Sequence, residues 1–222
     1  MEAIAHVVVE ASKIEADIQR IFGFDVRELD GVAKTVLTSF IQTTKLHPKG
    51  FGGTRAWGDG SAAIRAALIP LGWHPEDPQN QPRIVSADQR LAITVSSGSA
   101  YTGVADRTPQ TRNDKGAQTS VSVGFNARQG ELFPVTGQVV PLSQAESGQA
   151  LWILLYYIDL DNRELRYELS RPTAMSEHDK VNGWSTRYIF SPLRFDADVD
   201  VDHLHRSYED LPDIDIQVTP KN

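Results

Sequence analysis

The chain changes its hydrophobic period near residue 83, and this change constrains its fold more than any other feature. From Leu29 the apolar residues recur at i, i+3, i+4 and i+7, the spacing of an amphipathic helix, which we expect to end near Lys45. Further helices are expected around residues 12–22 and 61–73. The first third of the chain is therefore predicted to be helical.

After residue 83 the pattern is that of strands. Apolar and polar residues alternate in "RLAITVSS" (90–97) and "TSVSVGF" (119–125), which predicts two strands. Residues 151–158, "LWILLYYI", form an apolar run that is too short for a membrane helix of about 20 residues and is typical of a buried strand. With the turn "DLDN" and residues 164–169 it predicts a hairpin. Further strands are expected at residues 184–190 and in "DIDIQV" near the end.

This order predicts an α+β protein with N-terminal helices followed by a mainly antiparallel sheet. We expect one domain, with a helical part over about residues 1–72 and a sheet part over about residues 83–219.

The composition excludes several classes of protein. The chain of 222 residues has no cysteine, which excludes disulfides, thiol catalysis and thiolate metal sites. No targeting segment and no membrane span are visible, so we expect a soluble cytoplasmic protein.

Charge is concentrated in the C-terminal segment. Residues 195–222 hold eight acidic and two basic residues, a net charge of −6, whereas the whole chain has a net charge of −7. The rest of the chain is therefore nearly neutral. The acidic segment argues against contact of that surface with phosphate, so nucleic acid is a possible but disfavoured partner.

A glycine-rich segment, 47–61 ("HPKGFGGTRAWGDGS"), precedes the third helix, for which Asp59 or Ser61 is the expected N-cap. Glycine-rich backbone before a helix can cradle an anion, and Lys49 and Arg55 supply positive charge, with Trp57 available for stacking. The segment does not match a phosphate-binding loop, because Asp59 stands where lysine is required. A purely structural loop is the alternative interpretation.

A second long connection, 96–120, is polar and is expected to be irregular. Its candidate ligand-binding residues are Tyr101, Arg107, Arg112 and Lys115, which could contact a phosphate or nucleic acid. A solvated flexible loop is the alternative. If the two segments converge in space, their basic residues form one patch.

No motif of a known catalytic class is present in the sequence. The expected hairpin offers Asp159, Asp161, Glu164 and Glu168, which could serve acid–base chemistry. Aspartates in a turn, however, usually bond to their own backbone.

The C-terminal ladder "DADVDVDH" (196–203) has one register that resembles a calcium loop. Asp198, Asp200 and Asp202 take positions 1, 3 and 5, and Glu209 takes position 12. His203 stands where that loop needs glycine. A second option is a transition metal held by Asp202, His203 and His205. A solvated edge strand protected by its charge is the third interpretation.

From these observations we expect a non-catalytic binding or interaction module of bacterial or phage type, without a cofactor. Segments 47–61 and 96–120 would contact a protein partner or a small anionic ligand. One alternative is a hydrolase or nuclease that uses hairpin or C-terminal carboxylates with Ca²⁺ or Mg²⁺. The other is an assembly protein that docks a basic partner through its acidic segment. The oligomeric state is left open.

Overall fold

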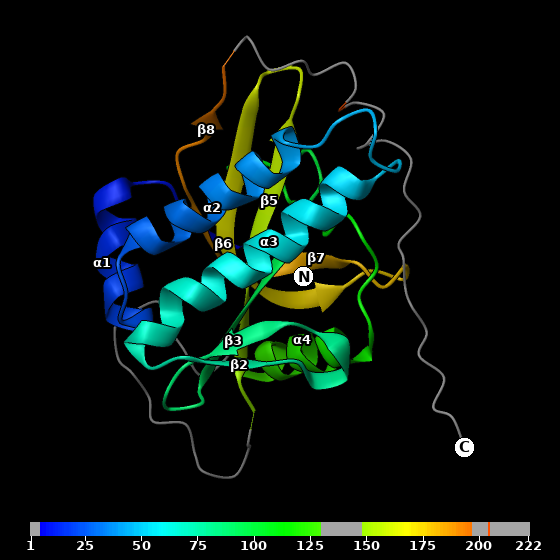
Figure 1. Ribbon diagram of the computed structural model, residues 1–222. Helices are drawn as coiled ribbons and strands as arrows, with labels where there is room; N and C mark the ends of the chain where they lie inside the picture. The colour runs from blue at the N-terminus through cyan, green and yellow to red at the C-terminus, as the bar shows by residue number, and fades with distance from the viewer. Residues whose placement is uncertain (1–4, 130–147, 197–203, 205–222) are drawn as a thin grey trace.

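A computed structural model describes residues 5–129 and 148–196, together with Leu204 (Figure 1). The helices are α1 (Ala11–Phe22), α2 (Val26–Ile41), α3 (Phe51–Leu68) and α4 (Ala117–Gln129), and short 3-10 turns span Ile69–Leu71 and Pro78–Asn80. The strands are β1 (His6–Val8), β2 (His74–Glu76), β3 (Arg83–Val85), β4 (Leu91–Ser97), β5 (Ala150–Asp159), β6 (Glu164–Met175), β7 (Val181–Ile189) and β8 (Leu193–Arg194).

The strands form one mixed sheet in the order β1-β7-β6-β5-β4-β3-β2, and β8 pairs with β6. The pairs β1–β7 and β4–β5 are parallel, whereas the other pairs are antiparallel. β4 and β5 can be parallel because α4 lies between them in the chain, and a parallel pair needs a long crossover. The structure thus confirms the prediction of an α+β fold with N-terminal helices and a mainly antiparallel sheet.

Strand β5 lies in the middle of the sheet and is buried on both faces. Trp152 and Leu154 belong to the core beneath α1, α2 and α3, whereas Ile153 and Leu155 belong to a second core with Val123 of α4. Because successive side chains of a strand point to opposite faces, two covered faces require an uninterrupted apolar run. The predicted buried strand and its hairpin with β6 are confirmed.

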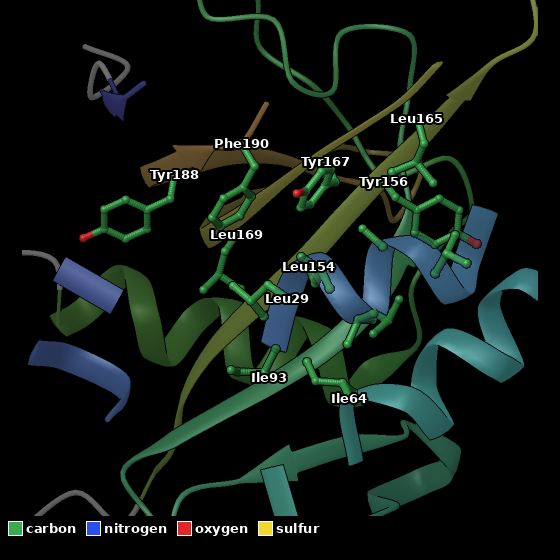
Figure 2. Close-up of a cluster of buried hydrophobic side chains, with 14 of the residues drawn as sticks. Leu29, Ile64, Ile93, Leu154, Tyr156, Leu165, Tyr167, Leu169, Tyr188 and Phe190 are labelled. Carbon is green, nitrogen blue, oxygen red and sulfur yellow. The ribbon is translucent and has the colours of Figure 1, made fainter. Parts of the chain in front are cut away.

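The larger core lies between the sheet and the first three helices. In Figure 1, α2 and α3 cross the same face of the sheet. Figure 2 shows Leu29 of α2 and Ile64 of α3 facing Ile93, Leu154 and neighbouring side chains of the sheet. Burying a side chain of this size contributes about 1.5–3 kcal/mol. Side chains of the helices and the sheet therefore pack together across this face.

The glycine-rich segment is not the irregular loop that we expected. Helix α3 begins at Phe51, with Gly50 as its N-cap at a φ of +79°, so most of residues 47–61 are helical. Glycine has a low helix propensity, but the packing of α3 against α2 outweighs this cost here. A carbon added at Gly60 would lie 2.6 Å from Val36 Cγ2 of α2. Gly60 therefore lets the two helices approach closely, and the predicted N-cap at Asp59 or Ser61 is wrong.

The strand predicted over residues 119–125 is also wrong, because this stretch belongs to α4. The buried side chains of α4 include Thr119, Ser122, Val123 and Asn126, which have helical spacing. Three of these four residues are polar, so hydrophobic periodicity missed this face. Asn126 donates to the carbonyl oxygens of Leu151 (2.8 Å) and Pro172 (2.9 Å) and accepts from Leu151 N (3.2 Å). Hydrogen bonds to the sheet thus replace part of the usual apolar contact.

The substitution Gly60→Ala should lower the free energy of unfolding by about 1–3 kcal/mol, because a new methyl group would collide with the stiff side chain of Val36. Gly58→Ala in the same helix meets no atom within 4 Å and should raise the stability by up to about 1 kcal/mol through helix propensity. Urea unfolding of both variants measures the two effects. If both substitutions changed the free energy of unfolding by the same amount and in the same direction, the close packing of α2 against α3 would be contradicted.

A buried tyrosine joins the sheet to α2. The Tyr167 hydroxyl donates to Asp30 Oδ1 at 2.6 Å, and the ring is almost fully buried. Burial, and then the neighbouring Asp30 carboxylate, raise the pKa of Tyr167 well above its usual range. The folded state therefore favours the neutral phenol.

This raised pKa predicts a loss of stability at alkaline pH. Its stabilising contribution is complete below the ordinary tyrosine pKa of about 10 and declines above it, because the unfolded chain then releases a proton that the folded chain retains. Tyr167→Phe should cost about 1.5–3 kcal/mol at pH 7 through the lost hydrogen bond to a carboxylate, and it should flatten the decline above pH 10. Urea unfolding between pH 7 and 11 tests this, with the exposed Tyr101→Phe as the control that keeps the decline. An unchanged slope in Tyr167→Phe would refute the assignment.

Candidate functional site

The long connection after β4 is a fixed irregular loop. It comprises residues 98–116, since β4 ends at Ser97 and α4 begins at Ala117. Gly98 pairs with Thr111 in an isolated bridge, and Ser99 N donates to Gln110 O at 2.9 Å. Thr111 N in turn donates to Val181 O of β7 at 2.9 Å. These bonds close the loop on itself and attach it to the sheet.

A buried ion pair lies beneath this loop. Glu168 of β6 and Arg187 of β7 are 0% and 2% exposed, and two of their contacts measure 2.6 Å (Arg187 Nη2 to Glu168 Oε2) and 2.9 Å (Arg187 Nε to Glu168 Oε1). Glu168 lies between Tyr167 and Leu169, which face the helices, so its side chain points to the opposite face. The pair therefore lies on the face away from α1, α2 and α3.

The same two side chains also bind the loop backbone. Glu168 Oε2 accepts from Gly103 N at 2.8 Å. Arg187 donates through Nη1 to Arg107 O at 2.6 Å and through Nη2 to Val104 O at 3.2 Å. The charges thus hold the turn from Gly103 to Arg107 against the sheet, and Glu168 Oε2 and Arg187 Nη2 each take part in two of these contacts.

Two further polar contacts complete this arrangement. The Ser170 hydroxyl donates to Glu168 Oε1 at 2.7 Å, and Trp184 Nε1 donates to Pro109 O at 2.8 Å. Removing two charges from water costs several kcal/mol per ion, which is recovered only when the geometry is good and every polar atom is satisfied. Here the polar contacts order a loop that has no apolar core of its own.

The fixed loop forms one wall of a surface pocket of about 350 Å³. Its lining residues are Ser99, Tyr101, Thr108, Pro109, Gln110 and Asn182. Five of these six side chains can form hydrogen bonds. Within the described part of the chain, the side chains of Tyr101, Thr108, Gln110 and Asn182 form no hydrogen bond to another protein group. Their donors and acceptors are therefore available to a ligand.

One of the candidate ligand-binding residues, Tyr101, lines this pocket, and a second, Arg107, contacts the Tyr101 ring without lining the pocket itself. Tyr101 is 50% exposed, and Arg107 Cζ lies 5.7 Å from the centroid of its ring. Arg112 and Lys115 are further along the loop, where their backbone N–H groups donate to β4 and to the turn before β7. The side chains of Arg112 and Lys115 do not line the pocket.

The other predicted ligand residues lie on the opposite side of the sheet. Lys49 lies two residues before the start of α3, and Trp57, which is 41% exposed, lies within this helix. Arg55 donates to Gln42 Oε1 at 3.0 Å and forms an ion pair with Asp59 at 3.5 Å. Since α3 covers one face and loop 98–116 covers the other, the two segments do not form one basic patch.

The hairpin carboxylates are held by their own neighbours. Asp159 accepts from the backbone and side-chain N–H groups of Asn162 at 2.9 and 3.0 Å, and from Arg166 at 2.9 Å. Burial opposes ionisation of Asp159, but these hydrogen bonds prevail and lower its pKa. Glu164 lies 3.5 Å from Arg166. A carboxylate with a lowered pKa and engaged oxygens is poorly suited to accept a proton in catalysis.

The candidate metal ligands Asp198, Asp200, Asp202 and Glu209 lie outside the described residues, as do His203 and His205. Among residues 5–129 and 148–196, no three histidine, aspartate or glutamate side chains are grouped so that they could hold a metal ion. No helix in these ranges is long and apolar enough to cross a membrane.

Sequence reasoning overlooked most of this site. The sequence marks Glu168 only as a hairpin carboxylate, and no sequence motif points to Arg187, Ser99, Thr108, Gln110 or Asn182. One signal is available: Glu168 and Arg187 are charged residues that stand beside large apolar side chains within expected strands, in "RYELS" and "TRYIF". Such residues are rarely fully buried unless they are paired.

Comparison with known proteins does not extend this description, because no protein-family model, no curated protein and no solved structure matches the chain. The interpretation of the site therefore depends on its own geometry.

Removal of the buried arginine should release the loop. Arg187→Met leaves the Glu168 carboxylate buried and unpaired, and should lower the free energy of unfolding by about 3–5 kcal/mol. Arg90→Met is the matched control, since Arg90 forms an exposed ion pair with Asp88, and it should cost less than about 1 kcal/mol. Urea unfolding gives the stabilities, and amide hydrogen exchange at Gly103 reports loop order. If both variants lost a similar amount of stability, or if the amide hydrogen exchange rate at Gly103 did not change, the ion pair between Glu168 and Arg187 would not be what holds the loop.

Proposed function

We propose that the protein is a non-catalytic binding module and that its ligand, a small molecule, occupies the pocket at loop 98–116. A single observation carries this proposal. A loop without an apolar core is fixed by a buried ion pair, and its outer surface presents several uncommitted hydrogen-bonding side chains around one pocket.

The size and chemistry of the pocket support this function. Its volume of about 350 Å³ is at the lower end of the range of about 300–1,000 Å³ that is usual for small-molecule sites. Tyr101 supplies an aromatic surface, and the amides of Gln110 and Asn182 can both donate and accept. A site of this kind suits a small polar ligand with a flat or apolar portion.

Preorganisation is the physical advantage of the ion pair. An irregular loop that orders only on binding spends part of its interaction energy on that ordering. The contacts from Glu168 and Arg187 order the loop in the folded protein itself. Supporting contacts of this kind are what keep the groups of a binding site in a productive geometry.

Protein-observed NMR with a library of polar fragments tests the proposal. We expect binding fragments to shift the amide resonances of Ser99, Gln110 and Asn182. Tyr101→Ala should weaken their binding about tenfold, equivalent to about 1.4 kcal/mol, because it removes the aromatic wall.

Trp57→Ala is the matched control, since Trp57 is an aromatic residue of similar exposure on the other face of the sheet, and it should leave these affinities unchanged. The proposal is wrong if no fragment shifts the resonances of loop 98–116, or if the fragments map to α3 and depend on Trp57 instead.

A further inference from the structure

The geometry of loop 98–116 points to a small ligand that carries a carboxylate or phosphate group, with Arg107 as the residue that selects for this charge. The inference depends on the proposed function, since it assigns a ligand class to the same pocket. It rests on the position of one guanidinium and on the charges around it.

Arg107 is held beside the pocket at two points. Its carbonyl oxygen accepts from the buried Arg187 at 2.6 Å, which fixes the backbone, and its guanidinium lies 5.7 Å from the ring centroid of Tyr101, a lining residue. Thr108, the next residue, also lines the pocket. The guanidinium is therefore anchored near the ligand through a main-chain contact and a ring contact.

The contact with Tyr101 leaves the donors of Arg107 available. A guanidinium above an aromatic ring interacts through its charge with the ring electrons, and this interaction is worth about 0.5–1 kcal/mol at an exposed site. It does not use the five N–H donors, whose planar arrangement fits carboxylate and phosphate oxygens. Within the described residues, Arg107 forms no ion pair and its side chain forms no hydrogen bond.

The charge beside the pocket favours an anion over a cation. Among the described residues, the side chains that line the pocket carry no charge of either sign, and Arg107, which precedes the lining residue Thr108 and contacts the Tyr101 ring, places a positive charge next to them. Two other arginines of this sheet face are engaged elsewhere: Arg187 binds Glu168, and Arg166 binds Asp159. Arg107 is a cation beside the pocket that a ligand can neutralise, and charge-assisted hydrogen bonds are about twice as strong as neutral ones.

The test compares charged probes with neutral analogues of nearly the same shape. Benzoate is paired with benzamide, and phenyl phosphate with phenyl methanesulfonate, and each is titrated into the full chain while the amide resonances of Ser99, Gln110 and Asn182 are followed. We expect the anion of each pair to bind at least tenfold more tightly. The benzoate and phenyl phosphate arms show which of the two anionic groups the pocket prefers.

Variants assign the selectivity to one residue. Arg107→Ala should abolish the preference for the anion, and Arg107→Lys should retain a weaker preference because it keeps the charge but loses the planar fork. Arg128→Ala is the control for overall charge, since Arg128 is an exposed arginine of α4, outside loop 98–116. It should leave the preference unchanged.

The two proposals can fail separately. If the neutral probes bind at the pocket as tightly as the anions, or if Arg107→Ala retains the preference, the inference about ligand charge is overturned while the binding function stands. If no probe shifts the pocket resonances at millimolar concentration, both are overturned. Because the Arg107 side chain is exposed and supports no other element, the variant should keep the wild-type spectrum outside the loop.

Discussion

The buried ion pair between Glu168 and Arg187 fixes the loop that covers part of one face of the sheet. Each residue belongs to a different strand, so the pair joins β6 to β7, and each also binds the backbone of loop 98–116. An apolar pair of similar volume would leave Gly103 N and the carbonyl oxygens of Val104 and Arg107 without these partners. Buried ions often contribute little net stability. Here they determine where a loop without an apolar core lies.

The central strand β5 separates two layers of different character. On one side, helices α1, α2 and α3 bury a continuous apolar core. On the other, α4 and loop 98–116 cover the sheet with a smaller apolar cluster and several hydrogen bonds between side chains and backbone. The first layer resembles a conventional helix–sheet interface. The second contains the pocket, because polar contacts leave irregular backbone and solvent-facing side chains near the surface.

The parts of the fold that were predicted correctly are those in which burial follows a regular apolar period. The stripe of α2 and the uninterrupted run of β5 are examples. The predictions failed where packing did not use large apolar residues. Gly60 of α3 is buried because it is small, and Asn126 of α4 is buried because its amide binds the sheet. A prediction from composition and hydrophobic periodicity alone therefore assigns such residues to a loop or to a solvated strand.

The sequence by itself determined the order of the main elements, the doubly buried strand β5 and the residue types of loop 98–116, including Tyr101 and Arg107. Only the tertiary structure decided that Glu168 meets Arg187, that both hold this loop, and that Asn182 of β7 lies beside Ser99 at one pocket. The physical reason is that periodicity records whether a side chain is buried, whereas it carries no information about which distant residue lies opposite. A buried charge or amide finds its partner only through strand pairing, so the site becomes visible only when the sheet is assembled.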